Sequence, residues 1–199
     1  MLRTARRHRY KRNEVVFHDG DPGETLHMIM KGHFAVRIST PLGDVAMVRV
    51  LGEGDHFGEL AVLAPGPRNG DAISLEAGET LALQRDDLQR LRETAPKIDE
   101  VLTLALVDEV RRLSAALVEA LYVPVEQRVW RRLLQLGDLY GPEDPVVIPL
   151  TQDDLAQLVG TTRPTLNQIL KAGEKRGFLH LGRGRLELCD TAALGQLVH

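Results

Sequence analysis

The feature that most constrains the fold is a change in glycine and proline use along the chain. From about residue 13 to residue 90, ten glycines divide the sequence into short runs. From about Ile98 to Leu121 the chain contains neither glycine nor proline. Because these two residues mark turns and interrupt helices, the first segment favours short strands and the second favours one continuous helix.

The glycine-rich segment has the pattern of a compact β structure. Its apolar runs include Glu14–Phe17, His33–Ile38 and Val45–Val50, and the last two alternate in part between apolar and polar residues. Alternation is the period of a half-buried strand, and short strands about ten residues apart with Asp-Gly turns are typical of a barrel or roll. Residues 1–95 are therefore predicted to form a compact all-β domain, either a barrel or a roll.

The uninterrupted helix carries one apolar stripe. Leucine and valine recur at spacings of three and four, at Leu102, Leu106, Val110, Leu113, Leu117 and Leu121. A helix of about 24 residues is roughly 36 Å long. The stripe fits either a core helix of one monomer or a seam between two copies. We favour the seam, and interpret residues 96–122 as a dimerisation helix. Pro124 ends or kinks it, which places a hinge near Tyr122–Val125.

The segment Leu150–Lys171 has the signals of a helix-turn-helix, within a predicted DNA-binding domain at residues 123–199. Thr151 with Asp154 three residues later resembles an N-cap with its capping acid. Gly160 suits the left-handed residue that ends the first helix, and Thr161 or Thr162 can cap the second. The alternative is a pair of ordinary packed helices with a polar surface.

In that arrangement the second helix presents polar side chains outward. Arginine can read guanine, and asparagine or glutamine can read adenine. The predicted outward residues are Arg163, Thr165, Asn167, Gln168 and Lys171. Lys171, Thr162 and Thr165 are candidates for phosphate contacts.

Residues Phe178–Leu188 read as a short hairpin with a basic glycine turn, the wing of a winged helix. Arg183 and Arg185 would touch the DNA backbone or minor groove. Residues 123–199 hold nine Lys and Arg against nine Asp and Glu, so the domain is neutral overall. Neutrality predicts modest non-specific affinity for DNA and reliance on sequence-specific binding by a dimer.

Several other classes of protein find little support. No apolar run approaches the roughly 18 residues of a membrane span, and no apolar segment follows the basic N-terminus as a signal peptide would require. A single cysteine, Cys189, allows no internal disulfide or multi-cysteine metal site, so we expect a cytoplasmic protein. We expect Cys189 to be a core thiol in an apolar strand. His27, His33 and His56 are available to haem, but no motif selects one. No P-loop, zinc-ligand spacing or nucleophile elbow indicates an enzyme.

In this order of parts, the chain resembles the cyclic-AMP receptor protein family, which includes the fumarate–nitrate reduction regulators. The best local matches are Gly52–Leu60, Pro67–Asn69 and the helix-turn-helix. The resemblance implies an α+β fold: a cyclic-nucleotide-binding-like β-roll, a long dimerisation helix and a C-terminal winged helix-turn-helix. The family's short first helix is mostly missing. We expect its solvated remnant in the basic stretch, at Arg3, Arg6, Arg7, Arg9, Lys11 and Arg12.

The resemblance also implies an effector pocket. In cyclic-AMP-binding members the phosphate meets backbone N–H groups and an arginine. The matching positions here are Gly58, Glu59 and Leu60, with Arg68 as the arginine and Asn69 beside it. Without a ligand role, Arg68 would form a salt bridge with Glu59 or Asp71.

Departures from the family pattern change the expected ligand. The Thr–Ser pair that reads adenine falls on Leu113 and Ser114. Without the threonine, one hydrogen-bonding group of the adenine edge stays unpaired, which costs roughly 1–3 kcal/mol of binding free energy. Asp71 adds negative charge near the phosphate position. We therefore expect weak or no cyclic AMP binding, and a protein that is effector-independent or tuned to another ligand. No cofactor is assigned with certainty and no metal is expected.

The recognition helix departs from the pattern as well. Arg163 matches the family arginine that reads guanine, whereas Pro164 and Gln168 replace a glutamate and a second arginine. The predicted function is a homodimeric transcription regulator that binds a palindromic promoter site and acts on RNA polymerase. The alternative is a cyclic-AMP sensor module with a weak or vestigial DNA-binding domain.

Overall fold

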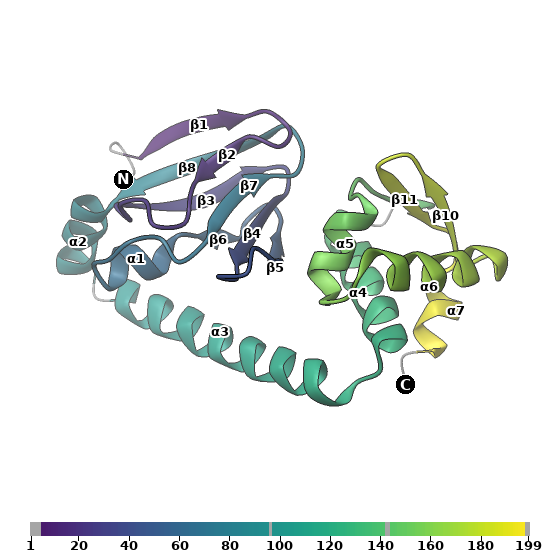
Figure 1. Cartoon of the computed structure of the whole chain (residues 1–199). Helices are drawn as coiled ribbons and strands as arrows, with labels where there is room; N and C mark the ends of the chain where they lie inside the picture. Colours follow the sequence, from purple (N-terminus) through teal and green to yellow (C-terminus); the bar gives the residue numbers. More distant parts are fainter. Residues whose placement is uncertain (1–4, 96, 142–143, 198–199) are drawn as a thin grey trace.

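The computed structural model describes residues 5–95, 97–141 and 144–197. A β-roll occupies the N-terminal part, a long helix runs beneath it, and a smaller helical domain lies beside the roll (Figure 1). Within the described residues, no helix combines the length and apolar character that a bilayer crossing requires. The prediction of an α+β fold with a roll, a long helix and a winged helix-turn-helix is confirmed.

The roll consists of two four-stranded antiparallel sheets, in the orders β1-β8-β3-β6 and β2-β7-β4-β5. Phe34, Phe57 and Ile29 are buried between them. The strands are β1 (Arg6–Tyr10), β2 (Val15–Phe17), β3 (Thr25–Lys31), β4 (Phe34–Ser39), β5 (Val45–Leu51), β6 (His56–Phe57), β7 (Asp71–Ser74) and β8 (Gly78–Gln84). Helix α1 (Glu59–Leu63) follows β6, and α2 (Arg85–Thr94) leads out of the roll.

The basic N-terminal stretch is a strand, so the prediction of a solvated helix remnant is wrong. Residues Arg6–Tyr10 pair along β8, from Arg6 opposite Ala82 to Tyr10 opposite Gly78. Arg7 and Arg9 point to one side, as alternate strand residues must, and both reach Glu79, at 2.8 and 3.1 Å. Arg3 lies outside the described residues.

Helix α3 (Lys97–Tyr122) confirms the predicted uninterrupted helix. It has no fully buried residue among those described. Large apolar side chains stay exposed along it, including Val110, Leu117 and Leu121, which are 61–65% accessible. The chain turns at Val123–Pro124, at the predicted hinge, and α4 (Val125–Tyr140) begins.

The C-terminal domain wraps helices around a small sheet of order β10-β11-β9. Trp130 on α4 fills its centre at 2% accessibility, where Gly173 leaves room for the indole ring. Its remaining elements are β9 (Val146–Ile148), α5 (Gln152–Val159), α6 (Arg163–Lys175), β10 (Leu179–Gly182), β11 (Arg185–Leu188) and α7 (Thr191–Gln196). Strands β10 and β11 form the predicted wing.

Cys189 is exposed, so the prediction of a core thiol is wrong. Leu186 and Leu188 on β11 are buried at 1% accessibility. Successive strand side chains point to opposite faces, so the residue after Leu188 faces outward.

The C-terminal domain is docked against the roll. One continuous apolar cluster includes Ala35, Met47 and Ile73 of the roll together with the core of the C-terminal domain. The face formed by β4, β5 and β7 thus packs toward α4 and α5, beside which it lies in Figure 1.

Candidate nucleic-acid interface and effector cavity

The first helix of the helix-turn-helix begins with a complete capping box. The Oγ1 of Thr151 accepts a hydrogen bond from the N–H of Asp154 at 3.1 Å. The carboxylate of Asp154 accepts one in return from the N–H of Thr151 at 3.0 Å. Gly160 ends α5 with φ +71°, a left-handed conformation that favours glycine. The predicted start and end signals of this helix are confirmed.

Helix α6 is capped by Thr162, which settles the alternative between Thr161 and Thr162. Its Oγ1 accepts from the N–H of Thr165 at 3.4 Å, and Pro164 occupies the first turn, where a missing N–H costs nothing. The hydroxyls of Thr162 and Thr165 also pair with each other at 2.9 Å. Leu166 and Leu170 are buried, which fixes the opposite face of α6 outward.

Three of the predicted base- and phosphate-reading residues lie on that outward face. Arg163, Gln168 and Lys171 are exposed. Asn167 is different, because it is half-buried and its Nδ2 donates to the Oε1 of Gln152 on α5 at 2.7 Å. Its side chain therefore joins the two helices of the motif.

A surface hollow of about 330 Å³ lies between the starts of α5 and α6 and the wing. Thr151, Arg163 and Arg183 all line it, so the fold brings together candidates far apart in the sequence. The guanidinium of Arg163 lies 3.2 Å from the carboxylate of Asp153, and both side chains are mostly exposed. Because the pair is solvated, it holds Arg163 weakly and leaves it available to an anionic or base partner.

The predicted effector residues gather at a cavity of about 430 Å³ between the roll and α3. Six of the seven line it: Gly58, Glu59, Leu60, Arg68, Asn69 and Leu113. Ser114 is not among the lining residues. It is exposed, and its Oγ donates to the carbonyl of Val110 at 2.8 Å. Its spacing from Val110 and Leu117 places it on the exposed apolar face of α3.

Arg68 is buried at 4% accessibility and braces the loop that precedes α1. It donates to the carbonyl of Gly58 at 3.0 Å and to the carbonyl and hydroxyl of Thr25 at 2.8 Å. Its guanidinium also lies 4.0 Å from the centre of the Phe17 ring. The alternative of a salt bridge to Glu59 or Asp71 is therefore not what the structure contains.

Two further observations bear on the anion chemistry of the cavity. Among the described residues, the Nε of Arg68 is buried without a hydrogen-bond partner, so one donor of the guanidinium remains for an anion. Asp71, expected to add negative charge there, does not line the cavity. Its carboxylate accepts from the N–H of Asp19 at 2.8 Å. This end of the cavity fits a phosphate group.

The cavity is also lined by a charged cluster that the sequence analysis missed. Glu109 on α3 receives two hydrogen bonds from Arg112, at 2.6 and 2.9 Å, and lies 3.5 Å from Arg49 on β5. Arg112 also donates to the carbonyl of Val48 at 3.2 Å. The hydrogen bonds from Arg112 lower the pKa of Glu109. The i, i+3 spacing of Glu109 and Arg112 was a visible signal, whereas nothing in the sequence linked Arg49 to them.

Comparison with known proteins agrees with both halves of the chain. The cyclic nucleotide-binding domain family matches residues 7–95, and the Crp-like helix-turn-helix domain family matches residues 127–197. A CRP-like cAMP-activated global transcriptional regulator of Mycobacterium tuberculosis (strain CDC 1551 / Oshkosh) is 31% identical over 191 residues, which cover 94% of this chain and 85% of that protein. The cyclic AMP receptor protein of Thermus thermophilus is 28% identical over 197 residues, which cover 98% of this chain and 89% of that protein.

Solved structures share the fold at lower identity. A CRP/FNR-family transcriptional regulator from Thermus thermophilus aligns with a TM-score of 0.82 at 21% identity, covering 97% of this chain and 98% of that one. FixK2 from Bradyrhizobium japonicum aligns with a TM-score of 0.85 at 18% identity, covering 98% of each chain.

Fold and sites together define a transcription regulator that joins a cyclic-nucleotide-binding-type roll to a winged helix-turn-helix. The chain belongs to the CRP/FNR family. Its relatives are transcriptional regulators rather than enzymes.

Proposed function

We propose that this regulator acts as a homodimer on a two-fold symmetric DNA site, which it reads with α6 and contacts with the wing. The observation that carries the proposal is the exposed row of Arg163, Gln168 and Lys171, adjoining the hollow that Arg183 and Thr151 line. A recognition helix of this kind enters the major groove, where arginine pairs with guanine O6 and N7. Thr162, Thr165 and Lys171 are the proposed phosphate contacts, and Asn167 would have to leave Gln152 to reach a base.

The dimer is proposed from the exposed stripe on α3. Leu117 and Leu121 present an apolar surface that the roll does not cover, and the exposed side chain of Val110 extends this surface to the edge of the cavity. A contiguous exposed apolar stripe on a helix is typical of a packing surface for another helix. A second α3 would cover it and set two recognition helices at a fixed spacing.

For the effector, we propose that cyclic AMP binds weakly or not at all. Relatives from Mycobacterium tuberculosis and Escherichia coli are named as cAMP-activated. Here the base end of the cavity offers apolar Leu113 and the cluster of Arg49, Glu109 and Arg112. That cluster already joins α3 to β5, the junction that a bound ligand would otherwise bridge. Action on RNA polymerase and a cytoplasmic location belong to the same proposal.

The test is selection from random-sequence duplexes by nucleotide-free protein. We expect a palindrome whose half-sites are about one helical turn apart, with one G·C pair per half-site read by Arg163. Arg163→Ala should cost about 1–3 kcal/mol per half-site contact and relax the preference at that pair alone. Equal weakening on all sequences would make Arg163 a phosphate contact. Failure to enrich any sequence, together with tight cyclic AMP binding, would favour the alternative of a sensor with a vestigial DNA-binding domain.

A further inference from the structure

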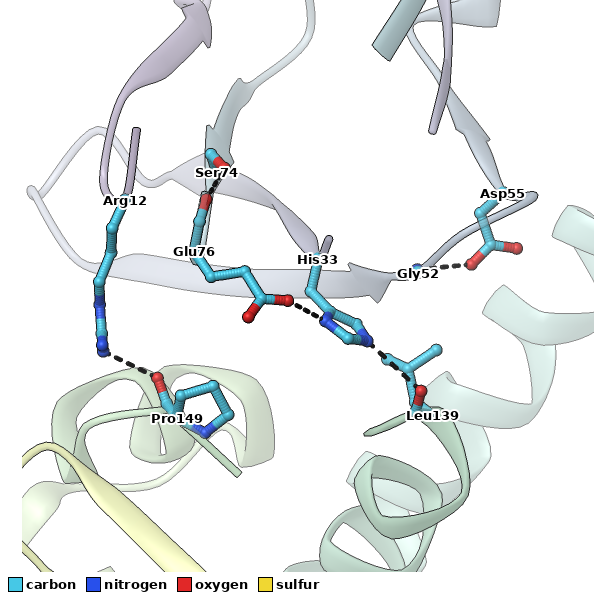
Figure 2. A network of polar contacts seen from close by, with 8 residues as sticks. All are labelled: Arg12, His33, Gly52, Asp55, Ser74, Glu76, Leu139 and Pro149. Carbon is cyan, nitrogen blue, oxygen red and sulfur yellow. Dashed lines mark hydrogen bonds and ion pairs between the residues drawn. The ribbon is translucent and has the colours of Figure 1, made fainter. Parts of the chain in front are cut away.

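The interface between the roll and the DNA-binding domain contains polar contacts in addition to its apolar cluster. The guanidinium of Arg37 on β4 binds the carboxylate of Asp154 in the α5 capping box at 2.7 Å. Arg12 donates to the carbonyl of Pro149 at 2.9 Å (Figure 2). These contacts hold the helix-turn-helix motif against the sheet of the roll.

His33 occupies the centre of this interface. Figure 2 shows its ring between Glu76 of the roll and Leu139 of the DNA-binding domain. The Nδ1 lies 2.5 Å from the Glu76 carboxylate, and the Nε2 lies 3.3 Å from the Leu139 carbonyl. The ring also stacks on Tyr140 with centroids 3.9 Å apart. A hydrogen bond from the Ser74 hydroxyl to the Glu76 carbonyl fixes the turn that carries the carboxylate.

Both partners of this ring are acceptors. A carbonyl oxygen cannot donate a hydrogen bond, and an ionised carboxylate cannot donate one either. A neutral imidazole has only one N–H, so it leaves one of the two contacts as a lone pair facing an oxygen. Both hydrogen bonds exist only when the His33–Glu76 pair holds one proton more than a neutral imidazole with an ionised carboxylate. This proton can be assigned to either side chain.

The position of Leu139 strengthens this argument. Its carbonyl is among the last four of α4, which have no partner within the helix, and the C-terminal end of a helix favours a cation. A protonated imidazole therefore meets a carboxylate on one side and the negative end of a helix dipole on the other.

We propose that His33 is a proton-dependent latch between the roll and the DNA-binding domain, closed by the imidazolium and weakened when the ring is neutral. The charged and titratable groups around it are Glu76 from the β7–β8 turn, Tyr140 from α4, Arg12 before β2, Arg37 from β4 and Asp154 from α5. Burial raises the pKa of the Tyr140 hydroxyl, so this phenol stays neutral and contributes no charge.

The sign of the effect follows from proton counting. The docked arrangement binds one proton at the pair, whereas a solvated imidazole loses its proton around pH 6.5. Docking therefore weakens as the pH rises and the pair loses this proton. The ratio of docked to undocked protein should fall by up to about tenfold per pH unit while that proton is being lost. Because docking fixes α6 relative to α3, a proton would alter how the recognition helices are presented.

The first test is histidine-side-chain ¹⁵N NMR on the full-length protein at about pH 7.5. His33→Phe, which keeps a ring against Tyr140, identifies the His33 signals among the seven histidines. We expect both His33 nitrogens to be protonated in the wild type. A singly protonated ring there would overturn the proposal.

Two variants separate the latch from a merely structural histidine. In Glu76→Gln the amide can donate to Nδ1 while a neutral ring donates to Leu139, so docking persists without the extra proton. In Gly52→Leu the new side chain wedges the interface, because even a Cβ at Gly52 would lie 2.9 Å from Leu139. We expect a singly protonated His33 in both. Double protonation in either variant would show that the proton is not tied to the docked pair.

The second test measures docking itself by energy transfer between dyes. Cys189 is the single cysteine and is exposed, and Leu42→Cys at a 92% accessible turn supplies the second site. Labelled protein is mixed with an excess of unlabelled protein, so that each labelled chain pairs with an unlabelled one and energy transfer occurs only between the two dyes of the same chain. Transfer should change between about pH 6 and pH 8 in the wild type and stay constant in Glu76→Gln. The same transfer at both pH values in the wild type would contradict the latch.

Discussion

Single buried polar residues hold the roll together, and His27 is the clearest of them. It is 5% accessible, and its two nitrogens lie 3.0 and 3.1 Å from the hydroxyls of Thr25 and Thr80. Its ring stacks on Phe57 with an angle of 4°. Burial, and next the nearby Arg68 cation, lower the pKa of His27 to about 4. The folded roll therefore keeps this imidazole neutral.

The lowered pKa of His27 predicts that the free energy of unfolding falls in acid because of this one residue. Below an unfolded-state pKa of about 6.5, the unfolded chain takes up a proton that the folded roll refuses until about pH 4. The His27 contribution is complete above pH 6.5, and up to about 3 kcal/mol is lost by pH 4. Urea unfolding at about pH 7 and pH 5 measures it. His27→Gln, which keeps an amide between the two threonines, should show a smaller loss over that range. An unchanged loss would mean that His27 does not titrate on unfolding.

The proposal of weak cyclic AMP binding depends on a single residue of the effector cavity, Leu113. Leu113→Thr places a hydroxyl at the base end, where an adenine amino group would otherwise be unpaired. We expect cyclic AMP affinity to rise by the worth of about one hydrogen bond, 1–3 kcal/mol. Isothermal calorimetry on nucleotide-free protein measures it, with Leu113→Val as the apolar control. Equal affinities for the threonine and valine variants would remove Leu113 as the reason for weak binding.

At the scale of elements, α3 separates three faces. Leu102, Leu106 and Glu109 line cavities against the roll, Leu117 and Leu121 stay exposed and apolar, and the residues at 111 and 115 are solvated. A helix with an apolar face left uncovered by its own domain predicts a partner helix.

Charge on the apolar face of α3 should therefore break the dimer. Leu117→Glu would bury a carboxylate in a helix–helix seam, which is unfavourable without a cation beside it. Analytical ultracentrifugation should show a monomer for this variant and a dimer for Ala115→Glu, which adds the same charge on the solvated side. A dimer in both variants would place the subunit contact elsewhere.

Local signals explain which elements the sequence predicts well. The capping box at Thr151, the left-handed Gly160 and the absence of Gly and Pro from α3 act within a few residues, and all three are confirmed. Strand β1 was missed because its pairing with β8, about 70 residues away, outweighs the solvated character of its arginines. Cys189 was wrongly predicted to be buried. The side chains of β11 alternate between the two faces of the sheet, and because Leu186 and Leu188 face the core, the next residue faces solvent.

At the scale of the whole molecule, domain docking could not be read from the sequence. His33 meets Leu139, and Arg37 meets Asp154, only after the roll and the DNA-binding domain have folded. The cluster of Arg49, Glu109 and Arg112 likewise forms only when α3 lies against β5. Both sets of contacts are made by protein groups alone, which supports a recognition surface that is set by packing.

Whether packing alone sets that surface is decided by a DNA-binding titration with and without cyclic AMP. Nucleotide-free protein would be titrated into a labelled duplex carrying the selected palindrome, with a scrambled duplex as the control for non-specific affinity. We predict specific binding with the same Kd whether cyclic AMP is absent or present at millimolar concentration. Specific binding that appears only with cyclic AMP would contradict this, since a ligand would then be doing what the contacts of Arg49, Glu109 and Arg112 are proposed to do.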